Sequence, residues 1–282
     1  MNNPKVKAFV GRNGSWLFAS VGCIVLWILM GLFGSGGVSL RSLIDNAYTA
    51  SFLAIAGIAQ MLVVTTGRGA IDLSIPGMIT LGAYTSMGIC NGSNAMIIPA
   101  LLVVLLEGLV IGALNSAMVI WLKIPAIIAT MAMNYIVVTG TMLIDHNFNV
   151  FTIPSFLETL TTYRIATVPI IVVLVILLAV LVNFLLTATT YGKSLLALGQ
   201  NKDAARLAGV RVVKVEMVTY MAAAALAGLA GALISARVTG AYLGMGDNYQ
   251  MESIACIVIG GTLMSGGRAN TAGTLVGSLF LY

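Results

Sequence analysis

Long apolar runs alternate along this chain with short polar or glycine-rich segments. Seven runs come close to the roughly 20 residues that an α-helix needs to cross the hydrocarbon core of a bilayer. They span residues 16–33, 47–66, 73–90, 96–122, 124–143, 168–186 and 215–238. None alternates polar and apolar residues with a period of two, as a membrane-spanning barrel requires. The pattern predicts an all-α polytopic integral membrane protein that folds as a helical bundle.

Two shorter apolar pieces follow, at residues 251–264 and 272–282, and bring the expected total to about nine hydrophobic segments. The last piece has eleven residues. A helix of that length rises only about 16 Å, roughly half the core thickness. We therefore expect the last segment to be C-terminally truncated. Residues 16–282 are expected to form a single transmembrane domain behind a cytoplasmic N-terminal tail at residues 1–15.

One polar segment, residues 187–214, separates two apolar runs and concentrates basic side chains against a single acid, Asp203. The basic residues are Lys193, Lys202, Arg206, Arg211 and Lys214. Between residues 201 and 214, alanine, leucine and valine stand among the charges, which predicts a short amphipathic helix that lies against another surface. From this pattern we expect Ala204, Ala205, Leu207 and Gly209 to face a partner protein.

The distribution of Lys and Arg between the loops predicts the orientation of the bundle. If the N-terminus is cytoplasmic, eleven basic residues share its side: Lys5, Lys7, Arg12, Arg68, Lys123, Lys193, Lys202, Arg206, Arg211, Lys214 and Arg268. The opposite side then holds only Arg41, Arg164 and Arg237. Because short cytoplasmic loops carry the excess of basic residues, this bias predicts a cytoplasmic N-terminus and a cytoplasmic segment 187–214.

Composition supports the membrane assignment, since 59% of the residues are hydrophobic and 8% are charged. The net charge of +5 follows from the basic residues that set the topology. It therefore indicates contact with a lipid bilayer and gives no reason to expect nucleic acid as a partner.

Glycine and proline interrupt the chain between two apolar runs, at residues 65–78. Gly67 and Gly69 allow the backbone to turn. Pro76 has no backbone N–H, so it cannot lie inside a helix without a kink. Irregular backbone of this kind can line a solute path, which makes Asp72 and Ser74 candidate translocation residues. It can equally be a tight connector in which one of these two side chains caps the following helix.

Glu107 is the ionisable residue that lies well inside an apolar run. An unpaired charge there is expensive, so the residue is a functional candidate by default. The competing interpretation is structural: the carboxyl group is protonated, lies near an interface, or is hydrogen-bonded to a group such as Asn115. We favour the structural role, because a proton- or sodium-coupled carrier typically has several such residues. Asn115 completes the set of translocation candidates.

A second glycine-rich break, residues 259–273, separates the two shortest apolar pieces. Short, glycine-interrupted segments hold binding sites in many transporters. The alternative is close helix packing through small residues. Candidate pairs for such packing are Gly108 with Gly112, Gly240 with Gly244, and Gly273 with Gly277.

The sequence lacks the motifs of several classes of enzyme. Residues 191–194 end like a phosphate-binding Walker A loop, but Thr187 stands where that motif requires a glycine. No nucleophile triad, metal-ligand box or pair of carboxylates occurs in the sequence. We therefore expect no catalysis, no metal and no cofactor in this chain itself.

Four blocks occur in an order that resembles one known family. They are GRGAIDLSIPGM at residues 67–78, GALNSAMVIWLKIPAIIATM at 112–131, YGKSLLALGQNKDAARLAGVRV at 191–212 and ESIACIVIGGTLMSGGRANTAGTLVGS at 252–278. From about residue 47 to its end, the chain resembles the ribose-type sugar permease subunits of bacterial ABC importers. That family also includes permeases for other monosaccharides, nucleosides and the autoinducer-2 signal.

The resemblance implies a multi-pass protein of the bacterial inner membrane that moves a sugar or sugar-like solute by alternating access. It implies three kinds of partner: a second permease subunit, a cytoplasmic ABC ATPase that holds ATP and Mg, and an extracytoplasmic solute-binding protein. Residues 191–212 match the ATPase-coupling region of the family. The coupling candidates are therefore Asn201, Ala204, Ala205, Arg206, Leu207 and Gly209. Two other classes stay open: a secondary carrier or facilitator without an ATPase, and a membrane scaffold that transports nothing.

Overall fold

The computed structural model describes residues 17, 19–29, 31–32, 39–145 and 152–282. The expected tail at residues 1–15 and both ends of the apolar run 16–33 lie outside these residues. The described part is mainly helical, with one two-stranded antiparallel hairpin that pairs Arg164 with Pro169 and Ile165 with Val168.

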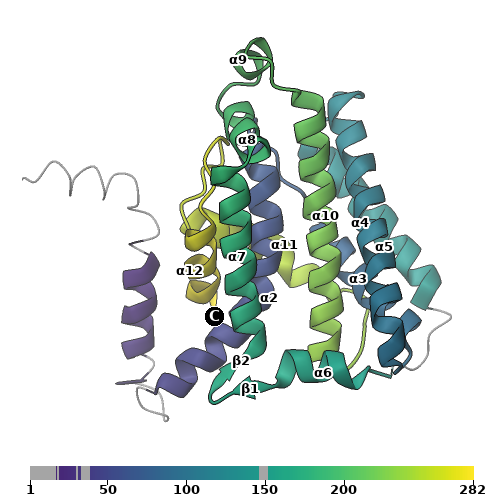
Figure 1. The fold of residues 1–282 in the computed structure, drawn as a ribbon, viewed down its shortest axis with the longest axis vertical. Helices are drawn as coiled ribbons and strands as arrows, with labels where there is room; N and C mark the ends of the chain where they lie inside the picture. The colour runs from purple at the N-terminus through teal and green to yellow at the C-terminus, as the bar shows by residue number, and fades with distance from the viewer. Residues whose placement is uncertain (1–16, 18, 30, 33–38, 146–151) are drawn as a thin grey trace, which may run out of the picture.

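After a short apolar helix at Ala19–Leu29, the elements follow in the order of Figure 1. They are α2 (Leu40–Thr65), α3 (Ile75–Cys90), η1 (Asn94–Met96), α4 (Ile97–Ile120), α5 (Ala126–Asp145), α6 (Ser155–Thr162), β1 (Arg164–Ile165), β2 (Val168–Pro169), α7 (Ile170–Ala188), α8 (Thr190–Gln200), α9 (Lys202–Leu207), α10 (Val212–Arg237), α11 (Asp247–Ile259) and α12 (Thr271–Leu281).

Five helices in the described residues are long and apolar enough to span a bilayer: α2, η1 with α4, α5, α7 and α10. This confirms the all-α polytopic class but not the expected count of nine segments. α3 has 16 residues, α11 has 13 and α12 has 11. Their rises of about 24, 20 and 16 Å are all shorter than the roughly 30 Å core. The breaks account for where α3 begins and where α11 ends, because residues 66–74 and 260–270 are not helical.

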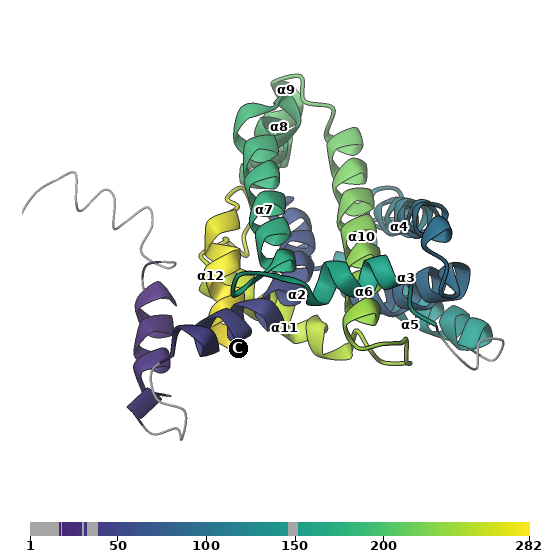
Figure 2. The ribbon, with the colours of Figure 1, turned by 60° about the horizontal axis from the view of Figure 1, so that its bottom comes forward.

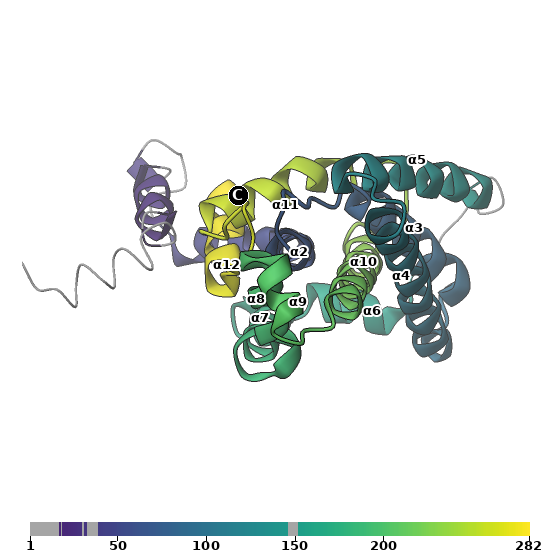
Figure 3. The same ribbon diagram turned by 90° about the horizontal axis from the view of Figure 1, so that it is seen from above.

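Helix α2 forms the centre of the bundle. Of the 18 residues in its most apolar stretch, 83% are buried. The corresponding fraction is only 28% in α4, α5 and α7, whose outer faces expose leucine, isoleucine and valine. In a membrane these faces contact lipid, so their exposure is expected. Figure 3 shows α3, α4 and α5 on one side of α10, and α7 and α12 on the other.

Glycine permits close backbone contact at several helix crossings. A Cβ atom added to Gly108 or Gly112 on α4 would overlap the backbone of α10, and one added to Gly277 on α12 would overlap the backbone of Cys256 on α11. The small-residue packing expected at these glycines is confirmed. It is absent at Gly240, where nothing in the described residues lies within 4 Å of an added Cβ.

The two ends of the bundle carry different structures (Figures 1 and 2). Helices α8 and α9 project at one end, and α6 with the hairpin covers the other. Arg164 in the hairpin pairs with Asp45 on α2 at 2.7 Å. In place of one amphipathic helix at residues 201–214, the structure has the six-residue α9, a short link, and α10 beginning at Val212.

Candidate coupling and translocation sites

Helix α9 is short but capped at both ends. The side chain of its N-cap, Asn201, accepts hydrogen bonds from the backbone N–H groups of Asp203 and Ala204, both at 3.0 Å. At the other end, Gly209 adopts φ +85°, and its N–H donates to Arg206 while the N–H of Val210 donates to Ala205. This is the Schellman arrangement, which needs a left-handed residue and so favours glycine. Asn201 and Gly209 therefore shape α9.

The coupling candidates differ sharply in exposure. Leu207 is 90% exposed at the tip of α9, whereas Ala205 is only 4% exposed. Ala204, Arg206 and Gly209 are also exposed. The sequence-based expectation that Ala205 faces a partner is therefore wrong for this conformation, because the small side chain is turned into the protein's own packing. Leu207 is therefore the large apolar side chain that α9 exposes at its tip.

Two polar contacts fix α8 and α9 to α10. Lys202 at the start of α9 pairs with Glu216 at 2.6 Å, and both side chains are largely buried. The hydroxyl of Tyr191 on α8 lies 2.8 Å from that of Thr219. Since Thr219 donates to the carbonyl of Val215, its oxygen accepts from Tyr191. Burial raises the pKa of Tyr191, and the bond to Thr219 partly offsets that rise. The phenol therefore stays protonated and able to donate at neutral pH.

An open cleft of about 510 Å³ lies between α8 and the beginning of α10. Its wall includes Tyr191, Ser194, Gly209, Arg211 and Lys214. Two cations at its rim make this cleft a suitable contact for acidic groups of a partner protein.

Three chain segments meet through backbone alone where α8 ends. Gly199 on α8 lies so close to the carbonyl of Thr65 on α2 that an added Cβ would overlap it. A Cβ on Gly67 would lie 2.8 Å from the carbonyl oxygen of Gly199. The N–H of Gly267, in the second break, donates to Thr65 at 3.0 Å. We call Gly67, Gly199, Gly266 and Gly267 the glycine crossing. It joins the coupling helices, α8 and α9, to both breaks: the first at residues 66–74 and the second at 260–270.

Beyond the glycine crossing, the first break runs back along α2. The amide of Gln60, oriented with its nitrogen toward the carbonyl of Asp72, donates to that carbonyl at 3.0 Å and accepts from the N–H of Asp72 at 3.2 Å. Gln60 is five residues before the end of α2, so Asp72 lies about 8 Å inside that end. Thr130 on α5 accepts from the N–H of Leu73, and its hydroxyl proton can be donated to the carbonyl of Ala126 on its own helix at 2.8 Å or to that of Ile71 at 3.2 Å. Helix side chains thus satisfy extended backbone inside the membrane, as lipid requires.

Three of the four translocation candidates meet in one buried cluster. Both the N–H and the hydroxyl of Ser74 donate to one carboxylate oxygen of Asp72. Asn115 on α4 donates its amide N–H to the hydroxyl oxygen of Ser74 at 2.8 Å. Asp72, Ser74 and Asn115 are at most 2% exposed. Ser74 stands at the N-cap of α3 but makes no side-chain cap bond. The cluster thus links the first break to α4.

The fourth candidate, Glu107, lies apart from this cluster. It accepts a hydrogen bond at 2.8 Å from the hydroxyl of Thr85, which joins α4 to α3. Its other carboxylate oxygen is buried without a partner among the described residues. Asn115, which the sequence offered as a partner for Glu107, binds Ser74 instead.

Sequence reasoning missed the uncharged polar residues that hold the first break. Gln60, Thr130 and Asn134 each lie inside an apolar run. Asn134, for example, accepts from the N–H of Gly77 at 2.8 Å. A usable signal was present, because an amide in the middle of a membrane span needs a partner and so indicates irregular backbone nearby.

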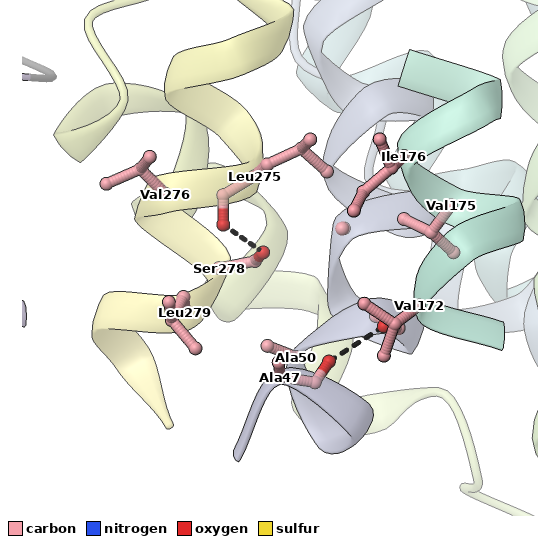
Figure 4. Close-up of a pocket in the computed structure, with 11 residues that line it drawn as sticks. Ala47, Ala50, Val172, Val175, Ile176, Leu275, Val276, Ser278 and Leu279 are labelled. Carbon is pink, nitrogen blue, oxygen red and sulfur yellow. Dashed lines mark hydrogen bonds between the residues drawn. The ribbon is translucent and has the colours of Figure 1, made fainter. Parts of the chain in front are cut away.

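A second cavity, of about 200 Å³, lies between α2, α7 and α12 (Figure 4). Its hydroxyl groups belong to Ser51 and Ser278, and each donates to a carbonyl of its own helix, Ala47 and Leu275 respectively. Its remaining surface is hydrocarbon from alanine, valine, isoleucine and leucine. Such a groove suits a lipid tail rather than a polar solute.

Comparison with known proteins identifies relatives with similar sequences. The ribose import permease protein RbsC of Escherichia coli (strain K12) is 29% identical over 277 residues, which cover 95% of this chain and 84% of that protein. The autoinducer 2 import system permease protein LsrC of Shigella flexneri is 29% identical over 271 residues, 96% of this chain and 78% of that protein. LsrC of Yersinia pseudotuberculosis serotype O:3 (strain YPIII) is 28% identical over 270 residues, 96% and 75% respectively.

These relatives confirm the resemblance to ribose-type importer permeases. No solved structure matches this chain with statistical significance. The family model described as the permease component of the branched-chain amino acid transport system matches residues 42–282. Since this match covers far more than half of the sequence, the chain belongs to that family of transport permeases.

Proposed function

We propose that this chain is the permease subunit of an ATP-driven importer for a small, uncharged, sugar-like solute. The observation that carries the proposal is the path from α9 to the cluster of Asp72, Ser74 and Asn115. The exposed, capped helix α9 is fixed to α10 and directly follows α8, whose Gly199 reaches both breaks through the glycine crossing. A docking surface is thereby connected to buried polar groups. The relatives named for ribose and autoinducer-2 import support the choice of solute.

The orientation that we propose places α8 and α9 in the cytoplasm of a bacterium, with the protein in its inner membrane and the N-terminus on the cytoplasmic side. Eight basic residues belong to segments at the α9 end: Arg68, Lys123, Lys193, Lys202, Arg206, Arg211, Lys214 and Arg268. Arg41, Arg164 and Arg237 belong to the opposite end. This asymmetry has the direction that the positive-inside rule requires.

A cytoplasmic ATPase would dock on the tip of α9. Ala204, Arg206, Leu207 and Gly209 would form the contact. The buried Ala205 would support it from within, and the exposed Asn201 would support it by capping α9. Covering one exposed leucine is worth about 1.5–3 kcal/mol, so Leu207 is expected to dominate. Arg211 and Lys214 would meet acidic groups on the same partner. ATP and Mg would bind to the ATPase. A second permease copy and an external solute-binding protein would complete the importer.

Glu107 would have a structural role in this importer. Its hydrogen bond to Thr85 joins α3 and α4, and no second carboxylate or histidine in the described residues is bonded to it. A single isolated acid does not form a proton relay across the membrane.

The experiment that tests this function compares solute uptake in cells or proteoliposomes with an active ATPase and with one that binds ATP but cannot hydrolyse it. Uptake that requires hydrolysis supports the proposal. Uptake that continues with the inactive ATPase would indicate a secondary carrier, and the absence of any flux with the active ATPase would indicate a scaffold.

A further inference from the structure

Arg237, in the last turn of α10, is held against α2 by two aromatic rings. Its guanidinium carbon lies 4.9 Å from the ring centroid of Tyr48 and 5.0 Å from that of Phe52. The two rings meet edge to face at 85°, with centroids 5.6 Å apart, so they form two walls beside the cation. One guanidinium nitrogen also donates to the hydroxyl of Thr49 at 3.3 Å. These contacts fix the outer end of α10, which lies opposite α8 and α9 (Figure 1).

The charge of Arg237 is not paired with a carboxylate among the described residues. The ion pairs found there involve other cations: Arg68, Arg164 and Lys202. A half-buried cation that faces aromatic rings is held less strongly than one that donates a short hydrogen bond to a carboxylate. The contact can therefore hold α10 in one position and still be broken by a conformational change.

The same face of α2 also holds the hairpin that leads into α7. Asp45, one turn before Tyr48 and Thr49, pairs with Arg164 of the hairpin at 2.7 Å. Residues three and four apart on a helix share a face, so one face of α2 fixes both the hairpin and α10. Figure 2 shows α6 extending from the outer end of α7 to that of α10. The outer ends of α7 and α10 are thus held to a common helix.

The inner ends of α7 and α10 are arranged differently. They are linked through α8 and α9, and the open cleft of about 510 Å³ lies between α8 and the beginning of α10. Lys202 on α9 pairs with Glu216, which is 21 residues before Arg237, so the two contacts lie about 32 Å apart along α10. Helix α10 is continuous and contains no proline, the commonest cause of a kink. A displacement of α9 is therefore transmitted along α10 to its outer end.

We propose that Arg237, seated between Tyr48 and Phe52, is an outer latch. It holds α10 against α2 while the cleft at the inner end is open, and it is released when the ATPase displaces α9. This inference rests on the proposed transport function and names residues that close its outer side. Release separates the outer end of α10 from α2 and from the hairpin, which stays paired with Asp45. The latch requires a guanidinium group, whose plane stacks on aromatic faces, whereas the ammonium of lysine is a compact and strongly hydrated charge.

The test measures one distance across the outer end by pulsed electron spin resonance. Nitroxide labels are attached to Val238→Cys, next to Arg237, and to Ile165→Cys in the hairpin, in a permease without its three native cysteines. Both side chains are exposed, at 43% and 62%. Because Arg164 pairs with Asp45, the label at residue 165 reports the position of α2. The importer, assembled with its ATPase in lipid nanodiscs, is compared in the nucleotide-free and ATP-trapped states.

The parent is expected to show mainly a short distance without nucleotide and a second, longer distance with trapped ATP. Arg237→Lys and Tyr48→Leu should each raise the ratio of the long to the short population about tenfold without nucleotide, the effect of losing a partly desolvated cation–π contact. The double variant should differ less than about twofold from Arg237→Lys, because no guanidinium is left for the ring of Tyr48 to bind.

Arg41→Lys is the matched control. It makes the same change on an exposed arginine of α2 that lies over no aromatic ring in the described part of the chain. Its distances should match those of the parent in both states.

Two results would overturn the outer latch. One is a parent whose outer distance is the same in both states. The other is an Arg237→Lys variant with the parent's distances in the nucleotide-free state, even if its melting temperature falls, since Arg237 would then only stabilise the fold. If Tyr48→Leu does not fold, Arg237→Lys decides alone, because lysine keeps the charge at the end of α10.

ATP-dependent uptake tests the transport function separately. A parent that transports without any change in the outer distance refutes the latch alone. A parent without ATP-dependent uptake refutes the transport function, while the nucleotide-free comparison of Arg237→Lys with the parent still decides the latch.

Discussion

The ammonium group of Lys202 lies 2.6 Å from the carboxylate of Glu216, so that the first residue of α9 is fixed to the second turn of α10. The side chains are only 18% and 9% exposed. An ion pair with so little exposure resists screening by salt better than a surface pair. It is therefore the main polar connection through which a displacement of α9 is transmitted to the membrane-spanning helix α10.

Breaking this pair should loosen α9 more than it weakens the bundle. Lys202→Met leaves Glu216 without a counterion, and the loss should stay below the roughly 3–5 kcal/mol of a fully buried pair. We expect faster hydrogen exchange in α8 and α9, lower transport and nearly normal membrane insertion. A Lys202→Glu, Glu216→Lys double variant should recover part of the loss. No recovery in the double variant, together with normal transport in Lys202→Met, would show that the contact is incidental.

Replacement of Gly199 should disconnect the coupling helices from α2. An added Cβ would overlap the carbonyl of Thr65 and the backbone of Gly267, neither of which can move aside easily. We expect Gly199→Ala to lower transport at least tenfold while basal ATP hydrolysis continues, and to lower the melting temperature. The matched control is Gly140→Ala on α5, where nothing in the described residues lies within 4 Å. Alanine is the better helix former by about 0.5–1 kcal/mol, so this control should be neutral or slightly stabilising.

The ATPase contact can be tested at Leu207. Leu207→Asp places a charge on a side chain that is 90% exposed, so folding of the permease alone should not change. Copurification of the ATPase and ATP-dependent uptake should both fall strongly. Ile165→Asp alters a side chain of 62% exposure at the opposite end of the bundle and should leave ATPase binding intact. Equal effects of the two variants would contradict the docking surface.

Glu107 should tolerate loss of its charge but not of its polarity. Glu107→Gln keeps an acceptor for the hydroxyl of Thr85, so uptake should remain close to that of the parent. Glu107→Leu removes the acceptor and should lower the folded yield, consistent with about 1–3 kcal/mol for an unpaired buried group. Size-exclusion yield and uptake are measured for both. A well-folded Gln variant without transport would instead favour a proton-coupled carrier.

Much of the bundle follows from the sequence because membrane spans obey a simple length rule. The expected run at residues 124–143 differs from α5 by only two residues at each end, and that at 96–122 differs from α4 by one and two. The short helix α11 is different. It spans Asp247–Ile259, whereas the expected run was 251–264, because its first turn is polar and hydropathy therefore does not mark where it begins.

The candidate site was only partly predictable from sequence. Asp72 and Ser74 stand out because a polar pair interrupts an apolar pattern, and the structure joins them to Asn115. Gln60 belongs to the same region through folding alone, since its amide is bonded to the backbone of Asp72. The burial of Ala205 beside the exposed Leu207 could not be predicted either. Helical periodicity shows which residues share a face, but not whether that face packs against the same chain or against a partner.

The central claim, that ATP drives a change at the buried polar cluster, is tested most directly by cysteine reactivity. Single cysteines replace Ser74 or Asn115 in a protein from which Cys23, Cys90 and Cys256 have been removed, with Ser86→Cys as a buried control. A small water-soluble thiol reagent is applied in the nucleotide-free and ATP-trapped states. The account predicts that cysteines at both cluster positions react in one state and are protected in the other, while the control stays unreactive in both. Cysteines at Ser74 and Asn115 that remain unreactive in every state would contradict it.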